Sequence, residues 1–311
     1  MGGVAIDEHG FVLITGAHHL IQFRSGTFKE FAYPSFGAIG IMGAGSLGTV
    51  AIGPRGGVWV LAFVPGGSRQ PAGVILTLDP FKSAHMRESI GPMDTSFDVI
   101  APAWDGEMWV IFDTRSPNNP NPSAVPWVFT AGPTYRGAVK PPIDLTYAEA
   151  LGTDGLMYLA TGPQLVYQNQ PPSEIFRFNQ NDRVVDTIDL PAGSAVQQMA
   201  VGPDGAMWFT DSGLNKIGRI ATDGTVAYYS IPSQNAGLAG IAPAGDGAMW
   251  FTETSANKIG RISMSGTVAE YTIPTPNENP QAISAGPIGH YIPNAVYFVD
   301  STGLGELVYR S

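Results

Sequence analysis

The chain has 311 residues, no cysteine, and 16 Lys and Arg against 26 Asp and Glu, which gives a formal net charge of -10. The lack of cysteine excludes disulfides, thiolate metal sites and cysteine nucleophiles. The acidic balance argues against nucleic acid as a partner, because phosphate contacts need clustered basic residues. No apolar run reaches the roughly 18 residues of a membrane span, and the first residues do not resemble a signal peptide, so we expect no membrane insertion.

The small share of charged residues is a second constraint. Only 14% of the chain is Asp, Glu, Lys or Arg, whereas a free soluble domain usually presents about 25–35% charged residues on its surface. Much of the exterior must therefore be neutral polar or apolar. Such a surface is tolerated when a partner covers part of it, so the composition favours a protein that works inside a larger assembly.

Internal repetition is the strongest signal in the sequence. The segment GPDGAMWFTD at 202–211 recurs as GDGAMWFTE at 245–253, and NKIGRI follows each copy, at 215–220 and 257–262. Weaker copies extend over the rest of the chain at intervals of about 42 to 50 residues, which is the period of a propeller blade. The repeated aromatic position is occupied, in chain order, by Leu13, Trp59, Trp109, Tyr158, Trp208, Trp250 and Tyr297.

Each repeat is expected to fold into four short antiparallel strands. In the clearest repeat, strands are predicted at 196–201, 206–210, 216–221 and 225–231, with Asp-Gly turns between the first pair and between the last pair. Seven such units predict an all-β, seven-bladed β-propeller in a single domain. The approximate blades, in chain order, are 1–42, 43–92, 93–142, 143–192, 193–234, 235–276 and 277–311.

The repeated motif resembles that of the streptogramin B (virginiamycin B) lyases, most strongly over 196–275. The resemblance implies a seven-bladed propeller and an elimination reaction that opens a cyclic depsipeptide antibiotic. It also implies a magnesium ion, and histidines in Pro-His-x-Ile segments at the start of the innermost strand of late blades. Here the matching segment is Asn279-Pro280-Gln281-Ala282-Ile283, in which Gln281 stands at the histidine position.

A glutamine amide cannot accept a proton as imidazole does near neutral pH. The resemblance therefore supports the fold and argues against the reaction. We expect a protein without catalytic residues; the alternative is a metal-dependent carbon–oxygen lyase.

Four carboxylates from different blades end the second strand of their repeats. In an antiparallel blade this position lies on the same face as the start of the first strand, so the carboxylates could ring one mouth and attract Mg²⁺ or Ca²⁺. The other interpretation is that each binds the backbone or the basic residues of its own blade. The four are Asp113, Asp211, Glu253 and Asp300.

Three adjacent repeats carry long loops on that same face, at 64–71, 114–122 and 162–170. Their proline content limits loop entropy, and their amide, guanidinium and phenol groups suit a neutral polar ligand such as a polysaccharide or a peptide backbone. Harmless insertion is the alternative, since surface loops tolerate it at low cost. The candidate ligand-binding residues are Arg69, Gln70, Arg115, Asn118, Asn119, Gln164, Tyr167, Gln168 and Gln281.

The last repeat is short by one strand. Residues 281–284, 295–300 and Leu304 to Arg310 supply three strands, and 4–6 are already needed for the first blade. The segment Leu304 to Arg310 is therefore predicted to be an open edge, which proteins usually cover or pair, unless a three-stranded blade is simply tolerated.

Together these features predict a binding module of a multi-protein assembly, with a polysaccharide or a protein as ligand. A phage tail or another surface particle fits such a chain, and so does a cytoplasmic location.

Overall fold

A computed structural model of the chain describes its strands throughout and most of its second half. The described residues are 4–6, 12–15, 19–24, 27–32, 46–52, 58–64, 72–78, 87–93, 96–102, 108–113, 124–129, 135–138, 146–161, 173–181, 183–285, 294–301 and 303–309. They contain strands and turns and no helix, so the all-β prediction is confirmed. Accordingly, no described segment is a helix that could cross a bilayer. The chain divides into two compact units, residues 1–145 and 146–311.

The first unit holds three antiparallel sheets of four strands each, and in each sheet neighbouring strands are consecutive in the chain. The predicted use of residues 4–6 in the first blade is confirmed, because Val4 pairs with Ile14. The strands are β1 (Val4–Ile6), β2 (Val12–Thr15), β3 (His19–Arg24), β4 (Thr27–Ala32), β5 (Ser46–Ile52), β6 (Val58–Val64), β7 (Ala72–Leu78), β8 (Arg87–Met93), β9 (Ser96–Pro102), β10 (Met108–Asp113), β11 (Ala124–Phe129) and β12 (Tyr135–Ala138).

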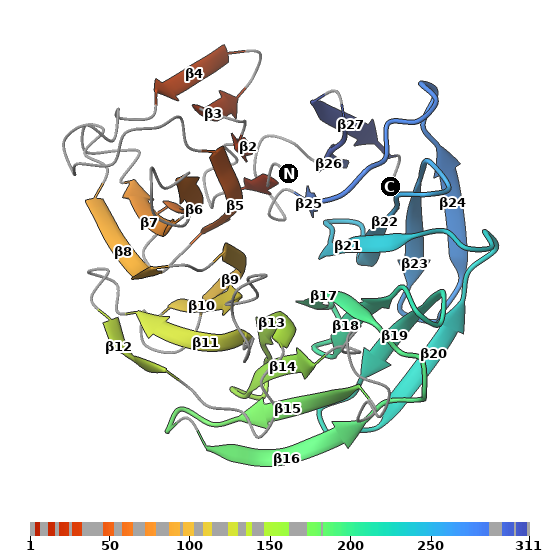
Figure 1. Cartoon of the computed structure of the whole chain (residues 1–311). Helices are drawn as coiled ribbons and strands as arrows, with labels where there is room; N and C mark the ends of the chain where they lie inside the picture. Colours follow the sequence, from red (N-terminus) through yellow and green to blue (C-terminus); the bar gives the residue numbers. More distant parts are fainter. Residues whose placement is uncertain are drawn as a thin grey trace. The chain divides into compact units, whose positions relative to one another are not determined.

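The second unit holds three further four-stranded meanders and one sheet of three strands. Its first strands β13, β17 and β21 lie side by side, and β16, β20 and β24 form the opposite, outer side of the unit (Figure 1). The strands are β13 (Thr146–Leu151), β14 (Met157–Thr161), β15 (Glu174–Phe178), β16 (Val184–Asp189), β17 (Val196–Val201), β18 (Met207–Asp211), β19 (Lys216–Ile220), β20 (Val226–Ser230), β21 (Leu238–Pro243), β22 (Ala248–Glu253), β23 (Lys258–Ser263), β24 (Val268–Thr272), β25 (Ile283–Ala285), β26 (Ala295–Val299) and β27 (Leu304–Val308).

The strands predicted for the clearest repeat are confirmed to within one residue at each end. The Asp-Gly turns explain this accuracy. Gly205 and Gly224 have φ angles of 76° and 86°, a region that costs glycine little and other residues more. Asp204 completes the first turn, because its Oδ1 accepts a hydrogen bond from the Ala206 backbone N–H at 3.2 Å.

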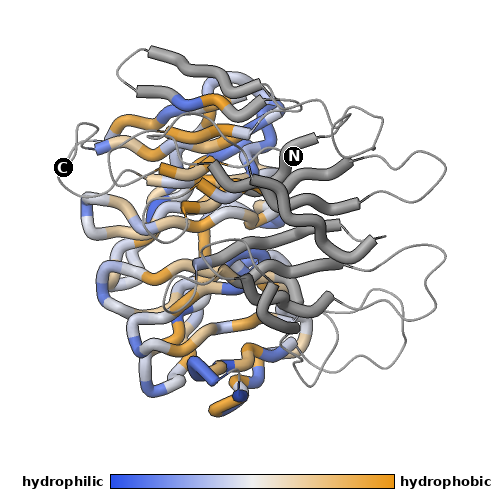
Figure 2. The backbone as a smooth tube through the Cα atoms, turned by 90° about the vertical axis from the view of Figure 1, so that its left-hand side faces the viewer, coloured by the Kyte–Doolittle hydropathy of each residue, from blue (hydrophilic) through white to orange (hydrophobic). Residues whose placement is uncertain are grey.

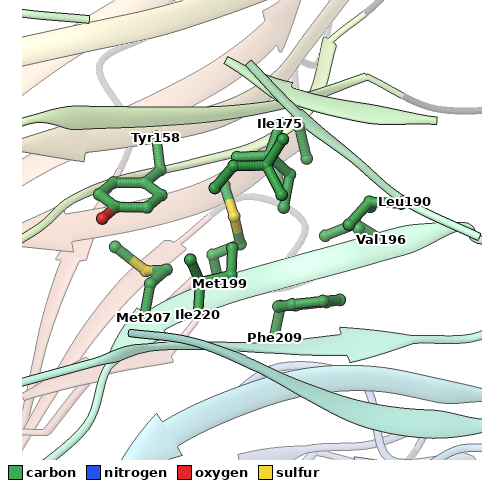
Figure 3. Packing of buried hydrophobic residues seen from close by; sticks show 11 residues of the cluster. Tyr158, Ile175, Leu190, Val196, Met199, Met207, Phe209 and Ile220 are labelled. Atoms are coloured by element: carbon green, nitrogen blue, oxygen red, sulfur yellow. The ribbon is translucent and has the colours of Figure 1, made fainter. Parts of the chain in front are cut away.

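Apolar layers between successive sheets form the core of the second unit. In Figure 2 its strands carry apolar stretches, while the turns between them are mostly hydrophilic. Figure 3 shows the layer between the sheets β13–β16 and β17–β20, where Tyr158, Ile175, Met199 and Phe209 meet. Trp208 and Phe251 belong to the next layer. Each sheet is thus covered by its neighbour, as the small and aromatic residues of the repeat require.

The last sheet, β25–β26–β27, contains three strands within the described residues, in agreement with the sequence prediction. Its first strand is shorter than expected and begins at Ile283 rather than Gln281. Gln281 still follows the sheet, because its backbone N–H donates to the Val299 carbonyl at 2.8 Å. Directly after β27, Tyr309 stacks on Trp250 with ring centroids 5.0 Å apart, and so ties this sheet to the preceding blade.

Candidate functional site

The start of each first strand and the end of each second strand meet on one face of the second unit. Val196 pairs with Asp211, and Leu238 pairs with Glu253. Gln281 is placed in the same way by its bond to Val299. The sequence prediction that these two positions share a face is therefore correct for the described blades.

Threonines in the second strands hold this face in register from one blade to the next. Thr210 Oγ1 donates to the carbonyl oxygen of Ala239 at 2.6 Å. In the next repeat, Thr252 Oγ1 donates to the carbonyl oxygen of Gln281 at 2.7 Å. Both threonine side chains are fully buried. The backbone of Gln281, which stands at the position of the family's histidine, is thus fixed by the neighbouring blade.

The side chain of Gln281 is partly buried at this face. Its Nε2 lies 3.4 Å from Thr254 Oγ1 and 3.4 Å from the Asn279 carbonyl oxygen, which are long hydrogen bonds. Gln197, the equivalent residue two blades earlier, is exposed and its Nε2 donates to Ala195 O at 3.3 Å. Loosely held amides can turn toward a ligand and both donate and accept hydrogen bonds.

Asp211 serves the structure of its own blade. Its Oδ1 accepts hydrogen bonds from the backbone N–H groups of Ala195 at 2.9 Å and Leu214 at 3.0 Å. The side chain is fully buried, and its Oδ2 has no hydrogen-bond partner among the described residues. This geometry matches the second interpretation of the acidic residues, in which the carboxylate binds local backbone.

Glu253 occupies the equivalent position one repeat later, but its longer side chain does not reproduce those bonds. The residue is fully buried, and within the described part of the chain neither carboxylate oxygen has a hydrogen-bond partner. Burial, and next the negative charge of Glu270, raise the pKa of Glu253 to about 7. Its carboxyl group is therefore largely neutral in mildly acidic solution.

Glu270 is the better-solvated neighbour and remains ionised. Its Oε2 accepts a hydrogen bond from Lys258 Nζ at 2.7 Å, and its Oε1 accepts one from the Ser233 backbone N–H at 2.8 Å. Burial acts to raise the pKa of Glu270, but these hydrogen bonds outweigh it and hold the pKa below its ordinary value. Lys258 is thus engaged with Glu270.

Asp300 closes the turn after β26, where its Oδ1 accepts a hydrogen bond from the Gly303 backbone N–H at 2.8 Å. Asp113 ends β10 in the first unit, and its side chain lies outside the described residues. Across the described residues, no three His, Asp or Glu side chains come together in a way that could hold a metal ion. The described acidic groups therefore do not fit a magnesium site, and the ring of four carboxylates stays a prediction.

The three long loops fall outside the described residues. Their candidate ligand-binding residues are therefore predictions from the sequence alone. The residues concerned are Arg69, Gln70, Arg115, Asn118, Asn119, Gln164, Tyr167 and Gln168.

The arginines that recur with the motif have a structural role. Arg219 Nε donates to Asp204 Oδ2 at 2.7 Å, and its guanidinium lies 5.8 Å from the centroid of the Trp208 ring. The same aspartate accepts a bond from Trp208 Nε1 at 3.0 Å. This ion pair is within one blade, and the aspartate that carries it was read from the sequence only as a turn residue. Asp246, Trp250 and Arg261 repeat the arrangement.

Comparisons with known proteins show which family and which solved structures this chain resembles. Residues 145–295 match the model of the virginiamycin B lyase family. No curated protein matches the sequence significantly. Virginiamycin B lyase from Staphylococcus aureus is 22% identical over 99% of this chain and 94% of its own, with a TM-score of 0.77. A catalytically inactive histidine-to-alanine variant of that enzyme, with quinupristin, matches equally well.

Two further structures have the same fold. A streptogramin B lyase is 26% identical over 98% of this chain and 91% of that chain, with a TM-score of 0.74. The β-propeller domain of Cps50 (Swd1) from Myceliophteria thermophila is only 8% identical, yet it covers 99% of this chain and 96% of its own with a TM-score of 0.68. The fold of this chain is thus shared by propellers that have very little sequence identity with it.

Proposed function

We propose that this β-propeller, of which residues 145–295 match the virginiamycin B lyase family, acts as a non-enzymatic binding module in a larger assembly. The ligand would be a polysaccharide or a protein, bound at the face that carries the long loops. A surface particle such as a phage tail is the setting that best suits a charge-poor chain with an open blade.

The observation that carries this proposal is Gln281. It stands where the family motif has a histidine, its backbone is held by Thr252, and its amide is only loosely bonded. An amide does not gain or lose a proton near neutral pH, so it cannot act as a general base there. The amides of Gln281 and Gln197 can instead form hydrogen bonds with sugar hydroxyls or peptide groups.

A glycan array and a gel-filtration run test the binding role. We expect the protein to retain a defined glycan or protein ligand, and Tyr167→Ala in the third long loop to weaken retention at least tenfold. Asp223→Asn is the matched control, because it lies in the β19–β20 turn at the opposite end of its blade. A strict monomer that binds nothing on any array would contradict the proposal.

The family match supports one alternative, a carbon–oxygen lyase that opens streptogramin B antibiotics. Incubation with a streptogramin B and Mg²⁺, followed by mass spectrometry, separates the two functions. We expect the cyclic compound to persist. Ring opening that is lost in Gln281→Ala or Asp300→Asn would establish the lyase instead.

A further inference from the structure

The outer edge of β27 can be compared with the same position in the other blades. Each of the other six sheets has a fourth strand, whereas no described strand pairs with the outer side of β27. β27 begins at Leu304 and is paired along its whole length with β26 on the inner side, down to Val308 opposite Ala295.

The backbone pattern shows which groups the edge offers. Asp300 N donates to Gly303 O at 3.0 Å, and Tyr309 N donates to Asn294 O at 2.7 Å. Residues 303 and 309 therefore bond inward to β26. Because alternate residues of an antiparallel strand bond to opposite neighbours, Leu304, Glu306 and Val308 direct their N–H and C=O groups outward.

The preceding blade shows how such an edge is filled. Gly260 pairs with Phe251 as Gly305 pairs with Phe298, so Arg261 of β23 corresponds to Glu306. In that blade the outward-bonding residues of β23 hold β24: Ile259 faces Tyr271, Arg261 faces Ala269, and Ser263 N donates to Thr267 O at 3.0 Å. An added strand can thus pair in the same register, with three residues opposite Leu304, Glu306 and Val308.

The side chains of β27 select the partner by charge. In the blade of β15, the corresponding residue is Arg177, which pairs with Asp186 on the outer strand through an Nε–Oδ1 hydrogen bond of 2.7 Å. In the last blade the sign is reversed, because Glu306 takes this position. It accepts a hydrogen bond from Tyr297 Oη at 2.9 Å and is otherwise exposed. A basic residue on the added strand would restore the cross-strand ion pair.

The positions on either side of Glu306 call for apolar residues. Val308 is 70% exposed, an unusual state for a valine in a sheet. In the two preceding blades, the residue opposite the equivalent of Leu304 is a tyrosine: Tyr229 stacks on Trp208, and Tyr271 on Trp250. The added strand would therefore read apolar, x, basic, x, aromatic.

A second copy of this chain fits the edge poorly. In the fully overlapped antiparallel arrangement of two β27 strands, Glu306 of each copy would lie opposite the other, and like charges directly opposite one another are destabilising. Both copies also carry a net charge of -10, which opposes their association and attracts a basic partner.

We propose that β27 binds an extended segment of a partner protein, one that places a Lys or Arg opposite Glu306 between two apolar positions and completes the last blade as its fourth strand. This inference deepens the proposed role as an assembly module and rests on it, but it uses a different surface from the long loops.

A synthetic peptide that copies residues 266–273 with Thr267→Val and Ala269→Lys, and so has the apolar, x, basic, x, aromatic pattern, is the probe. Fluorescence anisotropy measures its binding. The matched control peptide carries Ala269→Glu. We expect the Lys peptide to bind about fivefold more tightly and the Glu306→Lys protein to reverse this preference. Equal binding of both peptides by both proteins, or binding of neither, would overturn the inference.

Proline variants and hydrogen exchange check the site itself. Val308→Pro removes an outward N–H and should abolish binding without lowering the Tm, whereas Leu307→Pro breaks an inward bond and should lower the Tm. In the free protein the amides of Leu304, Glu306 and Val308 should exchange fast and slow down with the peptide. Protection of all three without peptide would mean that this chain or a second copy already covers the edge, and would overturn the inference.

If the wild-type protein binds the peptide but no ligand on the glycan array, only the proposal for the long-loop face is contradicted. The two proposals therefore fail separately.

Discussion

The ring of Phe209 lies flat against Gly218 on the neighbouring strand, in the space that a Cβ atom at residue 218 would occupy. Phe251 and Gly260 repeat this contact one blade later. Neither of these glycines has a positive φ angle, so backbone conformation does not explain them. The glycine of the NKIGRI motif is instead required because the aromatic ring leaves no room for a Cβ atom.

Gly218→Ala should lower the free energy of unfolding by about 3 kcal/mol, because the new methyl group overpacks the strand pair. Gly247→Ala is the comparison: it has a φ of 72° and nothing within 4 Å of the added Cβ, so only backbone strain of about 1 kcal/mol is expected. Urea denaturation measures both. A smaller effect at residue 218 than at residue 247 would contradict the packing argument.

Glu253 should make the protein less stable as the pH rises. The pKa of this carboxyl is about 7 in the folded protein, against an ordinary value of 4.5. A raised folded-state pKa contributes stability that is complete below pH 4.5 and is lost as the pH rises through about 7. Glu253→Gln should remove this component. The free energy of unfolding of the variant, measured relative to wild type, should therefore be higher at pH 8 than at pH 4 by on the order of 2–3 kcal/mol.

Denaturation curves at several pH values give this difference directly. Thr252→Ser is the control, because it changes the same buried strand without removing a titratable group, so its stability difference from wild type should not change with pH. A difference between wild type and Glu253→Gln that does not change with pH would show that Glu253 does not titrate in this range.

Thr252→Val should destabilise the contact between neighbouring sheets at the face that carries Gln281. The hydroxyl donates to Gln281 O and accepts from the Gly240 backbone N–H at 2.7 Å in a buried setting. Valine keeps the shape but leaves both buried groups unpaired, at a cost of about 2 kcal/mol. Thr252→Ser retains the hydroxyl and should cost less than half as much in the same thermal melt; equal costs would mean that the hydroxyl contributes little.

The ion pair between Asp246 and Arg261 should couple weakly but measurably. Arg261 Nε lies 2.7 Å from Asp246 Oδ2, and the arginine side chain is partly exposed. A double-mutant cycle with Asp246→Ala and Arg261→Ala should give a coupling free energy of about 0.5–1 kcal/mol. Asp246→Ala alone should cost more than Arg261→Ala, since it also removes the acceptor of Trp250 Nε1. A coupling of zero would show that the arginine contributes only through its packing.

The strand positions of the clearest repeat could be predicted because their signals are local. An Asp-Gly turn such as that at Gly205 needs only its own backbone geometry, and the 42-residue spacing of Trp208 and Trp250 marks the same place in two blades. A last sheet of three strands, which is what the described residues show, was predicted by counting the strand-like segments after residue 277. Gln281 was found because it interrupts a motif.

The residue pattern alone was sufficient to predict the β-propeller fold, the lack of a histidine at residue 281 and a last sheet with no fourth strand among its described residues. It did not predict that Asp211 is held by local backbone while Glu253 is buried without such bonds. The two residues occupy equivalent positions in nearly identical motifs, and their sequence neighbours do not distinguish them. Burial and hydrogen bonding depend on how neighbouring strands and blades pack around each carboxylate, which a local pattern of residues does not encode.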